Sequence, residues 1–449
     1  MQKIAIRNFM ALQDVDIEIK NLLILIGEQA SGKSTISKLV YFFKSIRQDL
    51  IEVIYDDLDG DPALHTQLWR KIGSKFYNYF GSTKHLENFE ITYWYDETNR
   101  LNLSLAEDKS LKVSFQPSEF YQSLFYGQMV TLIDEVKSHL KQENIYEQRA
   151  FQRSLNDLER YTETLFHDRQ IPLYLPAGRN ISVNYPEPFR FEFYGNLRGG
   201  IALQETKPNP VPSSDLYLMS SFLEQVERIK QRFRSNDFHT LLQDYQALGK
   251  SANEHVLRLV IDHIAKILRG DYQHDQNSEK IYYDAQHYVY LNNASSGQQE
   301  AIRILQDAFL TILDNEGVFR VIEEPEAHLY PTAQKYLMEI LVMMLNYTDS
   351  QLIITTHSPY ILGIVNNLLY ATRVARNNPL ASADVEQILP QATWLNPQDV
   401  TAYFLSDGGG ESIIDSAMGL LDQNMLDEIS EELGAEFQDL YRIHAREIA

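Results

Sequence analysis

Hydrophobic and polar residues alternate along the start of the chain and then give way to a continuously apolar run. The segments KIAIRNF, DVDIEIK and LLILI occupy residues 3–9, 14–20 and 22–26. Alternation is typical of half-buried strands, and the continuous run predicts a strand that is buried on both faces. After a glycine-containing turn, helical spacing over residues 34–54 predicts a long helix.

The middle of the chain changes from strands to helices. Residues 88–115 predict a meander of three strands, with polar turns at DETN and EDKS. Helical spacing follows over about 117–168 and again over about 216–268. The strand-like run IPLYLPAGR, at residues 171–179, separates these two helical blocks.

The last third of the chain returns to strands that alternate with helices. A hairpin is predicted from KIYYDA and HYVYLN, then a helix over 295–313, a strand over 317–324, a further helix and a strand over 351–357. Such alternation at both ends, around two helical blocks, predicts an α/β core that is split by a helical insertion. The predicted units are an N-terminal lobe (1–116), a mostly helical insertion with a short strand near 171–179 (117–275), a C-terminal lobe (276–397) and an acidic helical tail (398–449).

Composition narrows the class of protein. The chain has 449 residues, of which 44% are apolar and 23% charged, as in ordinary globular proteins. It has no cysteine, which excludes a disulfide framework, a cysteine-ligated metal site and a thiol nucleophile. The first residues, MQKIAIRNFM, do not resemble a signal peptide, and no apolar run reaches the roughly 18–20 residues of a membrane-spanning helix. We therefore expect a cytoplasmic protein without membrane association.

The net charge of −22 bears on possible partners. Such a chain repels nucleic acid on average, so contact with DNA requires a local basic stripe or a basic partner. Acidic residues gather towards the C-terminus, where residues 351–449 contain 14 Asp and Glu against 4 Arg and no Lys. This segment is either a protein-docking surface or a set of solvated helix faces.

A phosphate-binding loop is the most specific motif in the sequence. Residues 27–34, GEQASGKS, fit the pattern G-x-x-x-x-G-K-[ST] and lie between a predicted buried strand and a predicted helix. Glycines let backbone N–H groups turn towards phosphates, Lys33 supplies a positive charge, and Ser34 offers a hydroxyl to Mg²⁺. The helix that follows directs the positive end of its dipole at the anion.

Two later strands end in residues suited to phosphate chemistry. The strand VFRVI is followed by Glu323 and Glu324, and the strand LIITT by His357. Side chains at strand ends face the ligand crevice of an open α/β sheet. One carboxylate can hold Mg²⁺, the other can orient or deprotonate water, and the histidine can donate a hydrogen bond to a γ-phosphate. Taken singly, the two carboxylates are as compatible with an exposed acidic turn, and a lone histidine is more typical of a structural or solvated residue. The position of His357 after the next strand favours the phosphate role.

The segment ASSGQQ, at residues 294–299, precedes a predicted helix. Small residues at a helix N-terminus form an anion site, although a loop with a serine N-cap would look the same. A second phosphate site makes sense if this loop contacts the nucleotide of another subunit.

Together, these motifs and their order resemble the ATPase heads of the ABC/SMC class. GEQASGKS resembles Walker A, ASSGQQ the signature, VFRVIEEPEAHLYP Walker B with the following D-loop, and IITTHSP the switch-histidine motif. The forms EEPEAHLYP, THSP and LPAGR, with the opening IAIRNFMALQDVDI, are similar to the OLD-like AAA family ATPases of bacterial anti-phage defence. Chain length and the segment YFLSDGGG are most similar to the PtuA family of the Septu system.

The resemblance implies a fold, cofactors and site residues. The fold would be an ABC/SMC-type head, in which a P-loop sheet joins an antiparallel β lobe. The ligands would be ATP and Mg²⁺. Lys33 would contact phosphate, Ser34 and Glu323 would hold Mg²⁺, Glu324 would be the catalytic carboxylate, and His357 would sense the γ-phosphate. The nucleotide-binding residues would be Gly27, Glu28, Gln29, Ala30, Ser31, Gly32, Lys33, Ser34 and Thr35, with Ser295, Gly297 and Gln298 acting on the partner subunit's ATP.

Such a trans-acting signature implies a head-to-head homodimer or a larger homo-oligomer. The sequence departs from the usual signature, which has Leu and Gly where this chain has Ala294 and Ser296. The Q-loop residue is open between Gln67 and Gln116. Arg7 is compatible with contact to the nucleotide and with a surface role.

OLD-family nucleases carry a Toprim domain, whose strand-end glutamate and D-x-D pair hold Mg²⁺. The 92 residues after His357 contain no such pair, and the chain has no H-N-H-like cluster. We therefore predict an ATPase without intrinsic nuclease activity, which regulates a separate HNH-type nuclease (PtuB in Septu) and contacts nucleic acid through that complex. Apolar residues at helical spacing in 423–449 indicate either core packing or a docking helix for this partner.

The main alternative is a RecF-like DNA-repair ATPase that acts as a nucleotide-gated DNA clamp. It would need a basic groove, which the net charge disfavours. The helical insertion and the EEPEAH form argue against a transporter motor. A scaffold that holds ATP without turnover also remains open, because the signature is altered.

Overall fold

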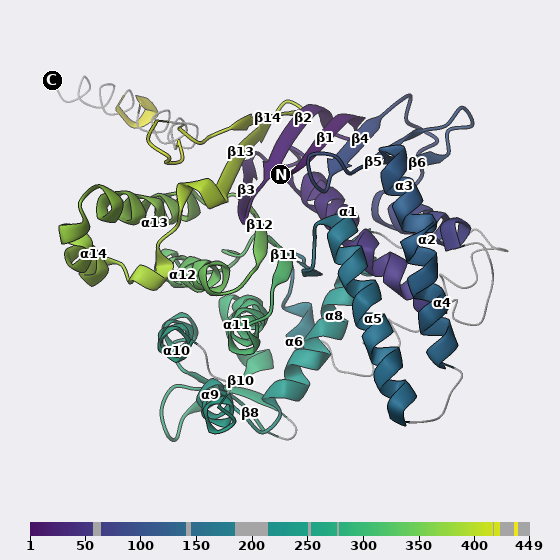
Figure 1. Ribbon diagram of the computed structural model, residues 1–449. Coiled ribbons are helices and arrows are strands. Elements are labelled where there is room, and N and C mark those ends of the chain that lie inside the picture. The colour runs from purple at the N-terminus through teal and green to yellow at the C-terminus, as the bar shows by residue number, and fades with distance from the viewer. Residues whose placement is uncertain are drawn as a thin grey trace.

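A mixed sheet of eleven strands runs through the described part of the molecule, with helices on both of its faces (Figure 1). The computed structural model describes residues 1–56, 64–140, 145–184, 214–249, 253–275, 278–415, 417–422 and 435–438. The predicted α/β class, in which a P-loop sheet joins an antiparallel lobe, is therefore confirmed.

One half of the sheet is antiparallel and comes from the N-terminal residues. Its strands are β1 (Gln2–Phe9), β2 (Leu12–Ile19), β4 (Glu90–Trp94), β5 (Arg100–Leu105) and β6 (Leu111–Gln116). They coincide with the alternating runs and with the predicted meander. In β4, Ile91 and Tyr93 are buried while Glu90 is exposed, as alternation requires.

The other half of the sheet is parallel. Its strands are β3 (Leu22–Gly27), β7 (Ile171–Leu175), β11 (Val318–Glu323), β12 (Gln351–Thr356) and β13 (Val400–Ser406), and β14 (Gly409–Ser412) joins the two halves. The strand order is β6-β5-β4-β1-β2-β14-β13-β3-β12-β11-β7. The carboxyl ends of β3, β12, β11 and β7 therefore meet at one edge of the sheet.

Two sets of helices cover the two faces of the sheet. Alternate residues of β3 face opposite sides, so that Leu23 and Leu25 join one hydrophobic core while Leu22 and Ile24 join the other. The first core contains α1 (Lys33–Asp56), α2 (Leu64–Phe80), α3 (Ser118–Phe125), α4 (Gln128–Leu140) and α5 (Ile145–Phe166). The second contains α8 (Ser214–Phe233), α9 (Phe238–Ala247), α10 (Glu254–Leu268), α11 (Ser296–Asp314), α12 (Pro331–Tyr347) and α13 (Pro359–Asn377). Two shorter helices are α6 (Ile181–Asn184) and α14 (Ser382–Ile388).

The predicted helical insertion supplies a strand of the main sheet. β7 pairs in parallel with β11, with Val318 opposite Ile171 and Ile322 opposite Leu175. Four of its five residues are buried, because it packs between α1 on one face and α8 on the other. The loop after β7 therefore opens at the same edge of the sheet as the phosphate-binding loop.

Residues 400–412 differ from the predicted acidic helical tail. They form β13 and β14, and β13 pairs in parallel with the whole of β3. The run VTAYFL is buried and rich in β-branched and aromatic residues, which suit a strand. Most of the segment 423–449, predicted to be helical, lies outside the described residues.

A small antiparallel sheet precedes α11. Its strands are β8 (Asp271–His274), β9 (Glu279–Tyr282) and β10 (Tyr288–Tyr290), in the order β10-β9-β8. β9 and β10 are the predicted hairpin. β8 was not predicted, because DYQH is short and polar.

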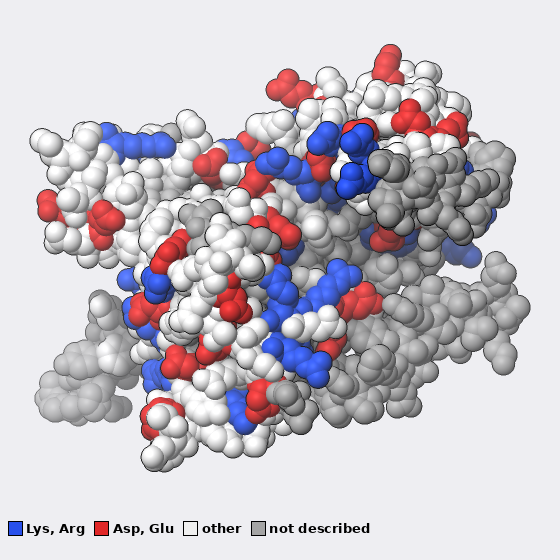
Figure 2. All heavy atoms as spheres, turned by 60° about the horizontal axis from the view of Figure 1, so that its bottom comes forward, with Lys and Arg blue, Asp and Glu red and all other residues white. Residues whose placement is uncertain are grey.

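No helix in the described ranges is both long enough and apolar enough to cross a lipid bilayer. The face drawn in Figure 2 carries acidic and basic side chains side by side, with Lys and Arg gathered near its middle. Positive charge is therefore available locally on this acidic chain.

Candidate functional site at the carboxyl edge of the parallel strands

The phosphate-binding loop connects β3 to α1 through a tight turn. A Cβ atom on Gly27 would lie 2.2 Å from the carbonyl oxygen of Leu405 in β13, so only glycine fits there. Ala30 and Gly32 both have positive φ angles, of 63° and 99°. The loop thus turns back on itself before α1 begins at Lys33, as the P-loop pattern predicts.

Lys33 is buried and bonds to neutral oxygens of its own loop. Its Nζ donates to the carbonyl oxygens of Gly27 at 2.9 Å and Glu28 at 2.6 Å. Burial lowers the pKa of Lys33, and the negative charge of Glu324 raises it. The ammonium group can therefore exchange carbonyl oxygens for phosphate oxygens without breaking an ion pair. The side chain of Ser34, in the first turn of α1, is exposed to an incoming ligand.

Glu323, the last residue of β11, is tied to β7 and the following loop. Its Oε1 accepts a hydrogen bond from the Tyr174 hydroxyl at 2.7 Å, and its Oε2 accepts one from the backbone N–H of Ala177 at 3.2 Å. The Tyr174 hydroxyl also lies 3.1 Å from the Ser37 hydroxyl of α1. Tyr174 thereby links the P-loop helix to Glu323. It was not among the predicted site residues, although the run IPLYLPAGR was the signal for it.

Glu324 has a strained backbone and an accessible side chain. Its φ is +43°, and its N–H donates to the carbonyl oxygen of Thr355 at 2.9 Å. Its Oε1 lies 3.6 Å from Nε2 of His357, and these side chains are 45% and 42% exposed. The charge of Glu324 also acts on Lys33. The structure therefore brings Lys33, Glu324 and His357 to one edge of the sheet, with the carboxylate and the imidazole open to a ligand.

Glu326 holds the end of β12 against the loop after β11. Its Oε1 accepts hydrogen bonds from the Thr356 hydroxyl at 2.5 Å and from the backbone N–H of His357 at 3.0 Å. Its Oε2 is buried and has no hydrogen-bond partner among the described residues. Glu326 was not among the predicted site residues, and here it holds the backbone of His357 in place.

The signature segment is organised as a helix cap. Ser295 and Gln298 form a reciprocal capping box at the start of α11, and Gln298 Nε2 also donates to the carbonyl oxygen of Leu268 at 2.6 Å. A Cβ atom on Gly297 would lie 2.6 Å from the carbonyl oxygen of His328, so glycine allows α11 to approach the loop after β11. Among the described residues, no hydrogen bond or ion pair joins Ser295, Gly297 or Gln298 to residues 27–35. Their action on another subunit stays a prediction.

Three further residues were candidates for the nucleotide site, namely Gln67, Gln116 and Arg7. Gln116 ends β6, the outermost strand of the antiparallel half, and accepts a hydrogen bond from Arg100 Nε at 3.0 Å. Gln67 lies on α2. Arg7 pairs with Asp14 and Asp16 of the neighbouring strand, each at 2.9 Å, and of the two roles left open for it these contacts favour the surface role. Gln116 is therefore remote from the P-loop.

The residues at the carboxyl edge fit a magnesium nucleotide. The close-packed loop supplies a cradle for phosphates, and Lys33 supplies a buried cation. Mg²⁺ prefers oxygen ligands and takes few of them from the protein when phosphates supply the others, as Ser34 and Glu323 would allow. When bound, Mg²⁺ neutralises charge on the phosphates. Glu324 can accept a proton from water, and His357 can donate a hydrogen bond to a terminal phosphate.

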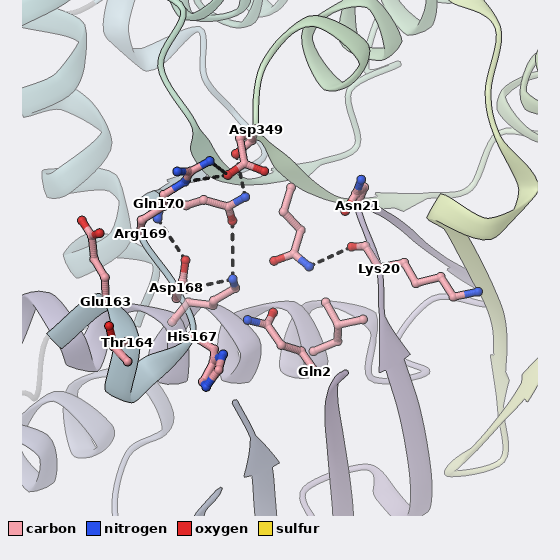
Figure 3. Close-up of a pocket in the computed structure, with 13 residues that line it drawn as sticks. Gln2, Lys20, Asn21, Glu163, Thr164, His167, Asp168, Arg169, Gln170 and Asp349 are labelled. Carbon is pink, nitrogen blue, oxygen red and sulfur yellow. Dashed lines mark hydrogen bonds and ion pairs between the residues drawn. The ribbon is translucent and has the colours of Figure 1, made fainter. Parts of the chain in front are cut away.

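A polar pocket of about 490 Å³ opens at the opposite edge of the sheet, where the parallel strands begin (Figure 3). Lys44 of α1 pairs there with Asp168, with 2.8 Å between Nζ and Oδ2. Arg169 pairs with Asp349, and Gln170 Nε2 donates to the Asp349 carbonyl oxygen at 2.8 Å. Lys44, Arg169 and Gln170 of this pocket thus bond to groups of the fold, whereas Oε1 of Gln351, which also lines it, is buried and has no hydrogen-bond partner among the described residues.

The chain is similar to known proteins over most of its length. An OLD nuclease from Thermus scotoductus (strain ATCC 700910 / SA-01) is 24% identical over 391 residues, which cover 84% of this chain and 62% of the relative. The match thus spans less than two thirds of the length of that protein.

Among solved structures, the SMC head bound to the C-winged helix domain of ScpA has a TM-score of 0.42 at 11% identity, covering 93% of this chain and 99% of that one. The SMC head domain from Thermotoga maritima has a TM-score of 0.36 at 10% identity, covering 92% and 97%.

The family model of the AAA ATPase domain matches residues 1–172 and 203–362. These ranges include the phosphate-binding loop, the signature segment, Glu323, Glu324 and His357. Because the model matches more than half of the chain, this protein belongs to the AAA ATPase domain family.

Proposed function

We propose that the chain binds and hydrolyses Mg²⁺-ATP as the ATPase subunit of an anti-phage defence complex and regulates a separate HNH-type nuclease. The observation that carries the ATPase part is the meeting of three structural elements at one edge of the sheet. The loop after β3 contributes Lys33, the end of β11 contributes Glu323 and Glu324, and the end of β12 contributes His357.

The geometry supports hydrolysis by an in-line attack of water on the γ-phosphorus. The new P–O bond forms with water, the bond between the γ-phosphorus and the bridging oxygen breaks, and ADP leaves. Glu324 takes the proton that water loses. Lys33 releases its loop carbonyls and holds phosphate oxygens. His357 donates a hydrogen bond to the terminal phosphate, and Glu326 keeps the backbone of His357 in place.

The proposed assembly is a homo-oligomer in which α11 of one subunit faces the ATP of another. The capped N-terminus of α11 carries the exposed side chains of Ser295 and Ser296. Since these residues make no polar contact with the phosphate-binding loop of their own chain among the described residues, contact in trans would give them a use.

The proposed nuclease partner rests on the motif forms, which resemble those of the OLD-like ATPases of anti-phage defence. The matched relative is called an OLD nuclease, and this chain spans 62% of it. We propose that cutting belongs to a separate chain, as with PtuA and PtuB in Septu, and that nucleic acid is contacted through the complex. Binding, hydrolysis or loss of ATP would then shift the complex between two arrangements of the nuclease partner.

Tagged purification from the native host, with mass spectrometry of the proteins that co-elute, tests this proposal. A small HNH nuclease in stoichiometric amount is expected. Recovery of the chain alone, or with recombination proteins and DNA, would contradict the defence complex and favour the RecF-like clamp. Binding of duplex DNA by the isolated chain, weakening steeply with salt, would point the same way.

A further inference from the structure

A fully buried arginine lies between β7 and α6, behind the carboxyl edge of the sheet. Arg179 is 0% exposed, and a charged group at that depth must be held by partners. Burial lowers the pKa of Arg179, whereas the charges of Glu300 and Glu323 raise it. Arginine stays protonated in proteins even when it is buried, and the hydrogen bonds of this guanidinium show which groups it binds.

The guanidinium group bonds to the backbone of both active-site carboxylate residues. Nη1 donates to the carbonyl oxygen of Glu323 at 2.5 Å, and Nη2 donates to that of Glu324 at 3.0 Å. Nη1 also donates to the carbonyl oxygen of Pro176 at 2.9 Å. Arg179 therefore binds the backbone of the turn at the end of β11.

Arg179 also contacts Glu300 of α11, the helix that begins within the signature segment. Glu300 lies five residues after Ser295 on α11 and is 2% exposed. Its Oε2 accepts the backbone N–H of Arg179 at 3.0 Å and lies 3.4 Å from Arg179 Nε, while its Oε1 accepts the N–H of Asn180 at 3.4 Å. A shift of α11 would therefore be passed to Arg179 directly.

Glu324, one of the two active-site carboxylate residues whose carbonyl oxygens Arg179 contacts, has a strained backbone. A φ of +43° is uncommon for glutamate and persists only where neighbouring groups hold it. The N–H of Glu324 donates to Thr355, and its carbonyl oxygen accepts hydrogen bonds from Arg179 Nη2 and from the backbone N–H of Ala327, each at 3.0 Å. Arg179 thus makes one of three hydrogen bonds that hold the backbone of the proposed catalytic residue, and it is the only side chain among these three partners.

We propose that Arg179 is a positioning residue that couples α11 to Glu324. Contact of the signature segment, residues 294–299, with the nucleotide of another subunit would then determine the position of the Glu324 carboxylate. A second contact also joins α11 to the loop after β11, because Gly297 packs against the carbonyl oxygen of His328 in that loop. This proposal rests on the proposed ATPase function and adds the link between the signature and the catalytic carboxylate.

The same helix offers a matched control. Arg303 is also fully buried on α11, and its Nη1 and Nη2 pair with Glu279 Oε1 at 2.6 Å and Oε2 at 2.7 Å. This pair ties α11 to β9, and among the described residues it has no hydrogen bond to Glu323 or Glu324; Arg303 Nε also donates to the Ser182 hydroxyl at 3.3 Å. A general effect of losing a buried arginine would therefore appear equally at either position.

The test compares Arg179→Lys and Glu300→Gln with Arg303→Lys and Glu279→Gln in the full chain. Phosphate release gives kcat, calorimetric titration gives the Kd of a non-hydrolysable Mg²⁺-ATP analogue, and thermal unfolding gives Tm. We expect Arg179→Lys and Glu300→Gln to lower kcat by about tenfold or more with Kd changed less than about threefold, because misplacing a reacting group acts on turnover. The controls should lower Tm comparably and keep kcat within about threefold. Equal losses of kcat in both sets would overturn the proposal.

Hydrogen exchange without nucleotide separates failure of this coupling from failure of the proposed function. In Arg179→Lys, the peptide covering residues 320–328 should exchange faster than in the wild type, while in Arg303→Lys it should not. Unchanged exchange in Arg179→Lys would overturn the positioning role, whatever the ATPase rate. A wild-type chain without phosphate release would instead contradict the proposed function.

Discussion

The two edges of the main sheet each receive a buried lysine from α1, but the lysines differ in their partners. At the carboxyl edge, Lys33 bonds to carbonyl oxygens of its own loop. At the opposite edge, Lys44 pairs with Asp168, and these side chains are 1% and 4% exposed (Figure 3). Burial lowers the pKa of both lysines. The partner, rather than the burial, therefore distinguishes a charge kept for a ligand from a charge already neutralised by the fold.

The other polar side chains at the two edges also differ in their exposure and in their partners. Glu324 and His357 are about half exposed and lie 3.6 Å apart. In the pocket at the opposite edge, Arg169 and Gln170 both bond to Asp349. A pocket of about 490 Å³ is present there, and Lys44, Arg169 and Gln170, which line it, already have partners within the fold. The two edges therefore differ in the exposure and in the partners of their charged groups.

The largest expected effect concerns the carboxyl edge. Glu324→Gln should lower kcat by about 100- to 10,000-fold, because the amide cannot accept the proton of the attacking water. ATP affinity should be retained, as measured by titration beside a phosphate-release assay. If this variant hydrolysed ATP at the wild-type rate, Glu324 would have no part in the chemistry.

A change at the opposite edge should affect stability instead. Asp168→Asn leaves Lys44 buried without its counter-charge, and we expect the free energy of unfolding to fall by about 3 kcal/mol. Denaturant unfolding measures this change, and titration should give an unaltered Kd for Mg²⁺-ATP. A Kd raised more than about tenfold would mean that the two edges are not independent.

Removing the lysine at the carboxyl edge should affect binding. Lys33→Ala loses a charge-assisted bond to phosphate, worth about 1.5–3 kcal/mol, or roughly 10- to 100-fold in Kd. Lys44→Met is the matched control on the same helix, and its Kd should stay within about threefold of the wild type. Equal weakening in both variants would remove the distinction between the two lysines.

The smallest expected effect is a dependence on pH. The free protein holds the pKa of Lys33 below its usual value of about 10.4, so Lys33 loses its proton at a lower pH than an exposed lysine. Below that pKa the affinity for ATP is constant, and above it the affinity falls as the pH rises. Titrations up to about pH 10.4 should show this fall in the wild type and a flatter profile in Lys33→Arg, which keeps its charge. Identical profiles would show that Lys33 does not titrate in this range.

The sequence predicted the residues whose roles depend on short motifs. Lys33, Glu324 and His357 each follow a recognisable strand, and parallel pairing brings the ends of those strands together. Tyr174, Arg179 and Glu326 were assigned no role, because their contacts are made with residues distant in the sequence. Tyr174 bonds to a residue 149 positions away, a pairing that exists only after β7 joins β11.

The fold was predicted best where periodicity is local. The meander and the buried strand β3 follow from alternation and from continuous apolarity. β13 was missed because acidic residues dominate the composition of the segment around it, although its own seven residues are mostly buried. Its place beside β3 depends on a parallel pairing across more than 370 residues, which no local pattern encodes.

Hydrogen exchange of the wild-type chain with and without Mg²⁺-ATP tests most directly whether the carboxyl edge is the nucleotide site. The account predicts slower exchange in peptides covering residues 27–35, 323–330 and 355–358, and no change in the peptide covering 163–170 at the opposite edge. Protection of residues 163–170 without protection of 27–35 would contradict it.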